Sequence, residues 1–187
     1  MFHPEYFALP KAGSARHLNT VFSPGLMTAL RAEIESDTAR PLECIPPTPA
    51  AALDKETVID TLLERGCPAT AEVIHALGRL TINKRIGLNR LSGIMPEHTN
   101  IETTRTLHTE PHLQFWVIFQ GQIRYDFPAN HYSGYRYDRS RWVADTGDVI
   151  CLNNLPYNPA KWPRYGIVSD EFPGNRLVLN FSHNPTS

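Results

Sequence analysis

The sequence lacks the features that mark membrane and nucleic-acid-binding proteins. Its 18 Lys and Arg residues and 19 Asp and Glu residues give a formal net charge of −1, so it offers no basic field to attract phosphates. No apolar run approaches the roughly 20 residues needed to cross a bilayer. The first residues, "MFHPEYFALP", show no basic stretch followed by an apolar one, so we expect no secretory signal. We therefore expect a cytoplasmic protein with no nucleic-acid or membrane partner. We also expect a small-molecule substrate. The sequence leaves the oligomeric state open, with a homodimer as one option.

Cysteine is also scarce. Cys44, Cys67 and Cys151 are odd in number and show no CxxC spacing, so we expect reduced thiols and no disulfide framework. None of the three stands in a local signature of a nucleophile. Cys151 lies in the apolar run "DVICL" and is predicted to be a small core residue.

Three helices are predicted in residues 1–79 of a single 187-residue domain. In "VFSPGLMTALRAEIES", Ser23 suits the N-cap and Pro24 the first turn. Asp54 is a candidate cap for "KETVIDTLLER", and Gly66 suits the end of that helix. The segment "PATAEVIHALGRL" has the pattern of a third helix.

Strands are predicted in residues 80–187. The segment "HLQFWVIFQGQIRYDF" predicts a hairpin whose strands meet at Gln120–Gly121. "RWVADTGDVICL" predicts two strands joined by a turn at 146–148, and "LTINKRIGLNRLSGIM" and "NRLVLNFS" predict two more. Short strands separated by glycine turns are typical of a β-sandwich or barrel, so the fold class is mostly β, preceded by about three helices.

A run of histidines and carboxylates, "PEHTNIETTRTLHTEPHLQFW", raises the question of a metal site. His108, Glu110 and His112 alternate along the chain, and alternate residues of a strand share a face. A straight strand would separate the outer two Cα atoms by about 13 Å. Donors on one ion lie within about 4 Å of each other. Binding of one ion by all three side chains is therefore disfavoured. Binding by His108 and Glu110, with a further ligand from elsewhere in the chain, stays open.

Short motifs in the second half resemble the aspartyl/asparaginyl β-hydroxylase-like branch of the iron(II)/2-oxoglutarate oxygenases. His98 in "MPEHTN", Arg105 and His108 in "TRTLH", and Arg176 in "NRLVLNFSHNP" occupy positions that match the family pattern. The resemblance covers Leu88 to Pro185. It implies a double-stranded β-helix core, cupin-like or jelly-roll-like, within residues 80–187, with the helices of residues 1–79 packed on it. It further implies that His98 binds iron, that Arg105 and His108 help hold 2-oxoglutarate, and that Arg176 pairs with the far carboxylate of this cosubstrate.

The sequence departs from that pattern at the metal. Asn158 stands where the second metal histidine is expected, both by the oxygenase pattern and by a cupin-like alignment of "HTEPHLQFWVIFQG", and Asn100 stands where a carboxylate is common. Amide oxygens are poor ligands for iron(II) beside imidazole or carboxylate. No histidine occurs between His131 and His183, which makes His183 the predicted replacement ligand.

Three functions are compatible with these residues. The first is a small-molecule oxygenase that uses iron(II) and 2-oxoglutarate to hydroxylate or desaturate a C–H bond. The second is a non-oxidative isomerase, cyclase or lyase, possible without any cofactor, in which His108 or His112 transfers protons together with Glu110. The third is a non-catalytic barrel that binds an anion. The predicted substrate-binding residues are Trp116, Tyr157 and Asn158. A structural ion pair of Arg176 with Asp148, Asp170 or Glu171 is the alternative to any anion site at that arginine.

Overall fold

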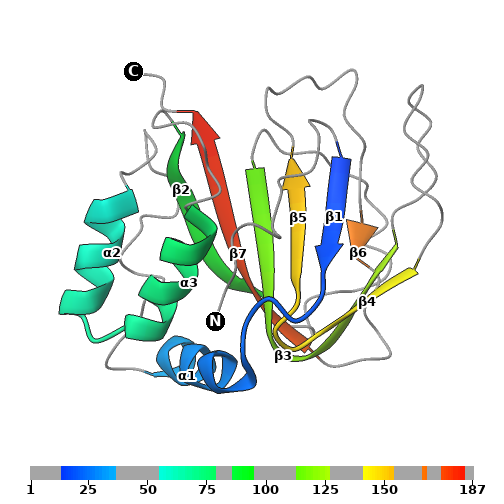
Figure 1. Cartoon of the computed structure of the whole chain (residues 1–187), viewed down its shortest axis with the longest axis horizontal. Coiled ribbons are helices and arrows are strands. Elements are labelled where there is room, and N and C mark those ends of the chain that lie inside the picture. The colour runs from blue at the N-terminus through cyan, green and yellow to red at the C-terminus, as the bar shows by residue number, and fades with distance from the viewer. Residues whose placement is uncertain are drawn as a thin grey trace.

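The computed structural model describes residues 14–36, 55–78, 86–94, 113–126, 141–153, 166–167 and 174–183. These residues form a mixed fold, in which a curled antiparallel half-barrel sheet carries three helices (Figure 1). The predictions of three helices and of a strand-rich second half are confirmed at this level. Within the described residues, no helix is both long and apolar enough to span a membrane.

The sheet brings together strands from both ends of the chain. Its order is β1-β5-β3-β7-β2, and β4 and β6 both pair with β3. The strands are β1 (Ser14–Leu18), β2 (Ile86–Ile94), β3 (Leu113–Asp126), β4 (Arg141–Asp145), β5 (Val149–Asn153), β6 (Gly166–Ile167) and β7 (Gly174–His183). All the pairings are antiparallel. The strand β1 was not foreseen, because it comes from the segment where helices dominate.

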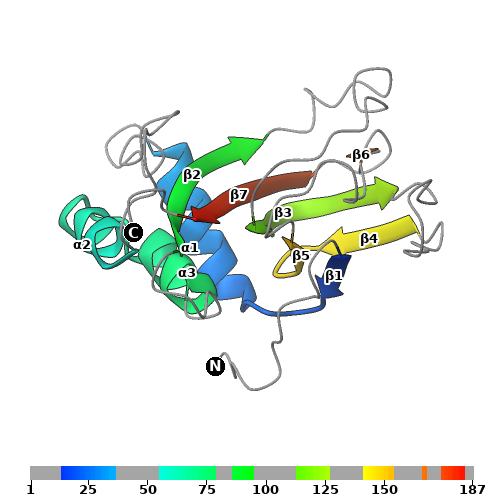
Figure 2. The ribbon, with the colours of Figure 1, turned by 90° about the horizontal axis from the view of Figure 1, so that it is seen from above.

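The predicted hairpin at Gln120–Gly121 is wrong, because β3 is one continuous strand of 14 residues. Its first half pairs with β5 and β7, and its second half with β4 and β6. The register against β7 shifts between Ile118 and Gln120, and Gly121 has a positive φ of 65°. Such a bulge bends a strand and increases its twist without reversing it. The glycine and the register shift therefore mark a bend within β3. Figure 2 shows the sheet and the three helices from above.

The three helices lie within the predicted segments, and each begins at the residue that the sequence indicated. They are α1 (Pro24–Glu35), α2 (Lys55–Glu64) and α3 (Pro68–Gly78). The Ser23 hydroxyl caps α1 by accepting from the Leu26 N–H at 3.2 Å. Gly66, after α2, has the positive φ of 74° that favours glycine at a helix end. The expected cap of α2, Asp54, lies outside the described residues.

A carboxylate on α1 fixes the start of α3. Glu33 accepts from the backbone N–H groups of Ala69 and Thr70 and from the Thr70 hydroxyl, each at 2.7 Å. These N–H groups belong to the first turn of α3, which has no intrahelical acceptors for them. The negative charge also complements the positive end of the helix dipole. One side chain thus joins two helices of the layer.

The two faces of the sheet carry different residues. The helix-facing side is apolar and packs with the helices into one core. Its members are Leu113, Phe115, Val117 and Phe119 of β3, Val149 and Cys151 of β5, and Leu177, Leu179 and Phe181 of β7. Phe115 and Phe181 meet edge to face there, with ring centroids 5.7 Å apart. Side chains alternate along a strand, so the intervening residues lie on the opposite side, which we call the far face.

The far face is buried as well. It presents Gln114, Trp116 and Ile118 of β3, Ile150 and Leu152 of β5, and Arg176 and Val178 of β7, none of them more than 5% exposed. Two members of this set, Gln114 and Arg176, are polar. Buried polar and charged side chains are uncommon and need a physical account. The far face therefore carries the candidate functional site.

Candidate functional site

The structure describes only some of the residues that the sequence proposed for function. Outside the described residues lie His98, Arg105, His108, Glu110, His112, Tyr157 and Asn158, and the predictions about them stay predictions. Trp116 and Arg176 lie within β3 and β7. The backbone of His183 forms the end of β7.

Arg176 stands near the start of β7, on the far face. It pairs in register with Ile118 of β3 on one side and Ile94 of β2 on the other. Only 5% of the residue is exposed, although a guanidinium is a charged group. Removing such a charge from water is costly, and anions or aromatic rings that face it offset that cost.

Trp116 supplies an aromatic surface for this cation. The guanidinium carbon of Arg176 lies 4.4 Å from the centroid of the Trp116 ring, within the range of a cation–π interaction. In the ladder Trp116 faces Val178, two residues beyond Arg176, so the arginine is its diagonal neighbour on the same side. The structure thus brings together two residues to which the sequence gave separate roles, one in cosubstrate binding and one in substrate binding.

The neighbours of this pair on the far face are mostly apolar. Ile118 and Val178 are its partners in the ladder, and Ile150 lies opposite Trp116 on β5. Gln114 of β3 is a polar side chain on this face, at 3% exposure. A charge interaction in such surroundings is weakened less by water than one at the surface. An anion that reached Arg176 would therefore be held more strongly than on an exposed arginine.

His183 is not brought to Arg176. The two residues are seven positions apart on the same strand, which corresponds to about 23 Å at the usual rise. Ile86 of β2 lies opposite His183, at the other end of the β2–β7 ladder from Arg176. The prediction that His183 replaces the missing metal ligand stays a prediction.

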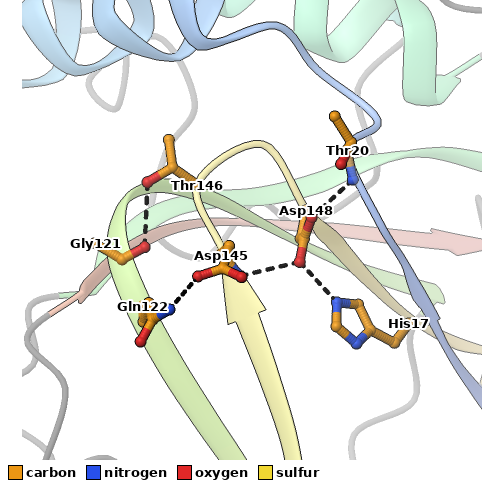
Figure 3. Close-up of polar contacts among 7 residues, drawn as sticks. All are labelled: His17, Thr20, Gly121, Gln122, Asp145, Thr146 and Asp148. Carbon is orange, nitrogen blue, oxygen red and sulfur yellow. Dashed lines mark hydrogen bonds and ion pairs between the residues drawn. The ribbon is translucent and has the colours of Figure 1, made fainter.

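A second polar cluster surrounds the turn between β4 and β5 (Figure 3). The carboxylate of Asp148, a residue only 4% exposed, accepts from the backbone N–H of Thr20 at 2.7 Å and of Asp145 at 2.9 Å. The Nε2 atom of His17 lies 2.9 Å from the same carboxylate. Asp148 therefore holds the end of β1, and its carboxylate is already engaged by these three groups. The alternative ion pair of Asp148 with Arg176 is not among its contacts, while Asp170 and Glu171 lie outside the described residues.

Backbone contacts bind this turn to β3 and to the start of α1. Gly147 donates to the Ile118 carbonyl at 2.8 Å, and the Phe22 N–H donates to the Gly147 carbonyl at 3.0 Å. Gly147 has a φ of 94°, and a Cβ there would lie 2.5 Å from the Phe22 carbonyl oxygen. Thr146 and Asp145 also bond to Gly121 and Gln122, where β3 bends. Hydrogen bonds thus hold the turn to two places on β3 and to the residue Phe22 before α1.

The two clusters lie on the same face of the sheet. Asp148 is two residues before Ile150, and His17 pairs in register with Ile150. The Asp148 carbonyl accepts from the Ile118 N–H at 3.0 Å, and Ile118 pairs with Arg176 on its other side. Two strand spacings, about 10 Å, therefore separate the Cα atoms of Asp148 and Arg176. The far face thus carries both a histidine–carboxylate pair and an arginine–tryptophan pair.

Sequence reasoning missed the pairing of His17 with Asp148, because 131 positions separate them. The "TGD" turn was recognised, but nothing in the order of the chain indicated that β1 would lie beside β5. The local signal was Asp148 directly after the turn residue Gly147, which suggests a carboxylate that binds the backbone near the turn.

The thiols are poor candidates for chemistry. Cys67 and Cys151 are free and buried. Burial raises the pKa of the Cys151 thiol far above its usual range, and the nearby Arg16 only partly opposes this. The thiol therefore stays protonated, and a protonated thiol is a weak nucleophile. The prediction that Cys151 is a core residue is confirmed.

Within the described part of the chain, no group of three or more His, Cys, Asp and Glu side chains is placed to hold a metal ion. Comparison with known proteins adds no further constraint, since no protein-family model and no curated protein matches the chain. The chain's own residues therefore provide the basis for its proposed function.

Proposed function

We propose that the protein is a small-molecule oxygenase of the iron(II)/2-oxoglutarate type, built on a double-stranded β-helix. The observation that carries the proposal is the buried guanidinium of Arg176, on the far face of a curled antiparallel sheet. A planar guanidinium on a rigid strand can hold a carboxylate with two parallel hydrogen bonds. The resemblance of the motifs around His98, His108 and Arg176 supports the same proposal.

The residues fit the organic cosubstrate better than they fit the metal. Arg176 would bind a carboxylate of 2-oxoglutarate, in surroundings that strengthen the contact. His98 is the proposed iron ligand, and His183, His108 or Glu110 would complete the metal site. The bound metal and cosubstrate would supply oxidative chemistry, in which 2-oxoglutarate and O₂ give CO₂ and succinate with one of the two oxygen atoms. The other oxygen atom would be inserted into a C–H bond of the substrate, or would leave as water with two substrate hydrogens on desaturation. Tyr157 and Asn158 would line the substrate side.

An anaerobic titration tests the proposal. Iron(II) and then 2-oxoglutarate are added to the full chain while the visible charge-transfer absorption of the chelated cosubstrate is followed. A saturable band is expected, absent in His98→Ala and shifted to higher 2-oxoglutarate concentration in Arg176→Lys. The lysine keeps the charge but loses the planar fork, so it separates bidentate binding from simple attraction.

Leu63→Ala on α2 is a control for this titration, since Leu63 is 52% exposed and far in sequence from the proposed site. Its band should match that of the parent chain. A protein that retains no iron and gives no band with 2-oxoglutarate would refute the oxygenase.

A second candidate function is non-oxidative proton transfer, and the His17–Asp148 pair favours it. A carboxylate that holds one imidazole nitrogen fixes the orientation of the ring, as in many general bases. The sequence had proposed His108 or His112 with Glu110 for this chemistry. NMR would follow deuterium uptake from D₂O into a panel of 2-oxo acids. Uptake that needs no iron and is lost in His17→Gln would select this function over the oxygenase. Binding of the acids with neither activity would select the non-catalytic anion-binding barrel.

A further inference from the structure

The contact between Arg176 and Trp116 restricts how the guanidinium can meet a ligand. All five N–H groups of an arginine lie in the plane of the guanidinium. The Trp116 ring lies against the guanidinium at 4.4 Å from centroid to carbon. Both residues are at most 5% exposed, and both stand on adjacent, hydrogen-bonded strands. The ring therefore limits the tilt of the guanidinium on a rigid part of the sheet.

We propose that Trp116 is the positioning residue of the anion site, holding the guanidinium so that a ligand carboxylate meets its N–H edge. This inference rests on the proposed role of Arg176 as the carboxylate anchor. It changes the role that the sequence suggested for Trp116, from contact with the substrate to orientation of the arginine. It also selects the chemistry of the ligand, because an edge-on fork matches a planar carboxylate.

The surroundings favour a carboxylate over a phosphate. Ile118 and Val178 are the ladder neighbours of the pair, and both are buried and apolar. Desolvating a charge is costly, and a doubly charged phosphate loses more hydration than one carboxylate group. We therefore expect 2-oxoglutarate and succinate to bind more tightly than inorganic phosphate at the same pH and ionic strength.

The alternative is that Trp116 is simply a large core residue. The two roles differ in what a substitution changes. If Trp116 only packs in the core, Trp116→Phe and Trp116→Leu should differ from each other in stability and bind the ligand with equal affinity. A positioning role makes affinity follow the aromatic character of the side chain, with Phe retaining most of it and Leu losing it.

Calorimetry on the full chain with anaerobic iron(II) measures affinity for 2-oxoglutarate, for succinate and for phosphate. Trp116→Phe should bind 2-oxoglutarate within about threefold of the parent, and Trp116→Leu about tenfold more weakly, as expected for the loss of a buried cation–π contact. Because the Leu variant can fail to fold, a second test replaces all tryptophans by 5-fluorotryptophan, which keeps the size of the ring and weakens its negative face. Binding should weaken a few-fold in the parent chain and not in Trp116→Phe.

Fluorescence gives a readout that packing alone would not change. The chain has 3 tryptophans, so Trp142→Phe and Trp162→Phe are matched controls for Trp116→Phe. Adding 2-oxoglutarate should change the emission of the parent and of both controls, and leave Trp116→Phe unchanged.

The outcomes separate this inference from the proposed function. Equal affinity of the Leu, Phe and fluorinated proteins, with Arg176→Lys still weakened, would overturn the role of Trp116 and leave the arginine anchor standing. Unchanged affinity in Arg176→Lys would overturn both. Affinity that follows the ring without any iron-dependent band would support Trp116 and remove the oxygenase. Tighter binding of phosphate than of succinate would overturn the selection for carboxylates.

Discussion

The two faces of the sheet solve the same problem of burial in different ways. On the helix-facing side, apolar side chains from three strands pack against α1, α2 and α3, and each contact there is explained by removal of carbon from water. On the far face, equally buried strand positions include a charged guanidinium and an amide. Burial of an arginine is not explained by the hydrophobic effect, so the far face carries a chemical requirement that the helix-facing side does not.

This difference predicts that substitutions on the two faces have different effects. Substitutions on the helix-facing side should lower the free energy of unfolding, and those at the polar positions of the far face should mainly change ligand binding. The turn around Asp148 lies between these extremes, because it is polar and also holds the ends of β1 and α1. Four substitutions test this prediction, measured by urea denaturation and thermal melting.

The largest loss of stability is expected for Phe115→Ala. The ring is fully buried on the helix-facing side and meets Phe181 edge to face. Loss of the buried carbon and the cavity left behind should lower the free energy of unfolding by about 3–5 kcal/mol. Leu63→Ala, at a residue that is 52% exposed, should change it by no more than about 0.5 kcal/mol. Similar values for the two would contradict the placement of the core.

A smaller loss is expected for Gly147→Ala, where the turn joins α1 to the sheet. The new methyl group would meet the Phe22 carbonyl oxygen at 2.5 Å, at a φ of 94°. Strain of the backbone and overpacking together should cost about 3 kcal/mol. Gly66→Ala is the matched control, because its φ is also positive but its Cβ would meet nothing within 4 Å. That variant should lose only about 1 kcal/mol, and a larger loss there than at Gly147 would argue against the close approach.

Asp148→Asn should cost about 2 kcal/mol, since an amide nitrogen replaces an oxygen that accepts hydrogen bonds at a buried position. The lost acceptor serves Thr20 in one orientation of the amide and Asp145 and His17 in the other. His17→Gln should cost less, because it removes one partner and leaves both backbone bonds in place. An Asp148→Asn protein as stable as the parent would show that the carboxylate is held for chemistry and not for the fold.

Among the four test substitutions, the smallest change in stability is expected for Arg176→Met. The methionine keeps most of the buried volume, and replacing a buried charge by an apolar side chain often leaves stability within about 1 kcal/mol. The thermal shift caused by 2-oxoglutarate in the parent chain should disappear. A loss of several kcal/mol together with an unchanged ligand shift would assign the arginine to the fold and place it with the helix-facing side of the comparison.

Local features of the fold were readable from the sequence, because local chemistry determines them. The serine cap and proline at the start of α1, the glycine after α2, and the turn between β4 and β5 all depend on residues close together in the chain. The hairpin at Gln120–Gly121 was wrong for a related reason. A glycine with positive φ serves either a turn or a bulge, and only the pairing partners of β3, which lie elsewhere in the chain, decide between them.

The candidate site was predictable only in part. Arg176 and Trp116 were both singled out, but not their contact, because it depends on the register between β3 and β7. The His17–Asp148 pair escaped notice because it depends on a strand order that places the first strand beside the fifth. The remaining predicted site residues lie outside the described part of the chain, so their roles stay predictions.

The position of β1 also has a consequence for how the chain acquires its fold. Its only ladder partner among the described strands is β5, and His17 meets Asp148 across 131 residues of sequence. Bringing such distant segments together carries a loop-closure cost and favours slow folding. At about 5–20 residues per second, a ribosome needs on the order of ten seconds to make the chain between them. β1 therefore leaves the ribosome long before its partner β5, and during that interval the edge of β1 must be kept from pairing with another chain.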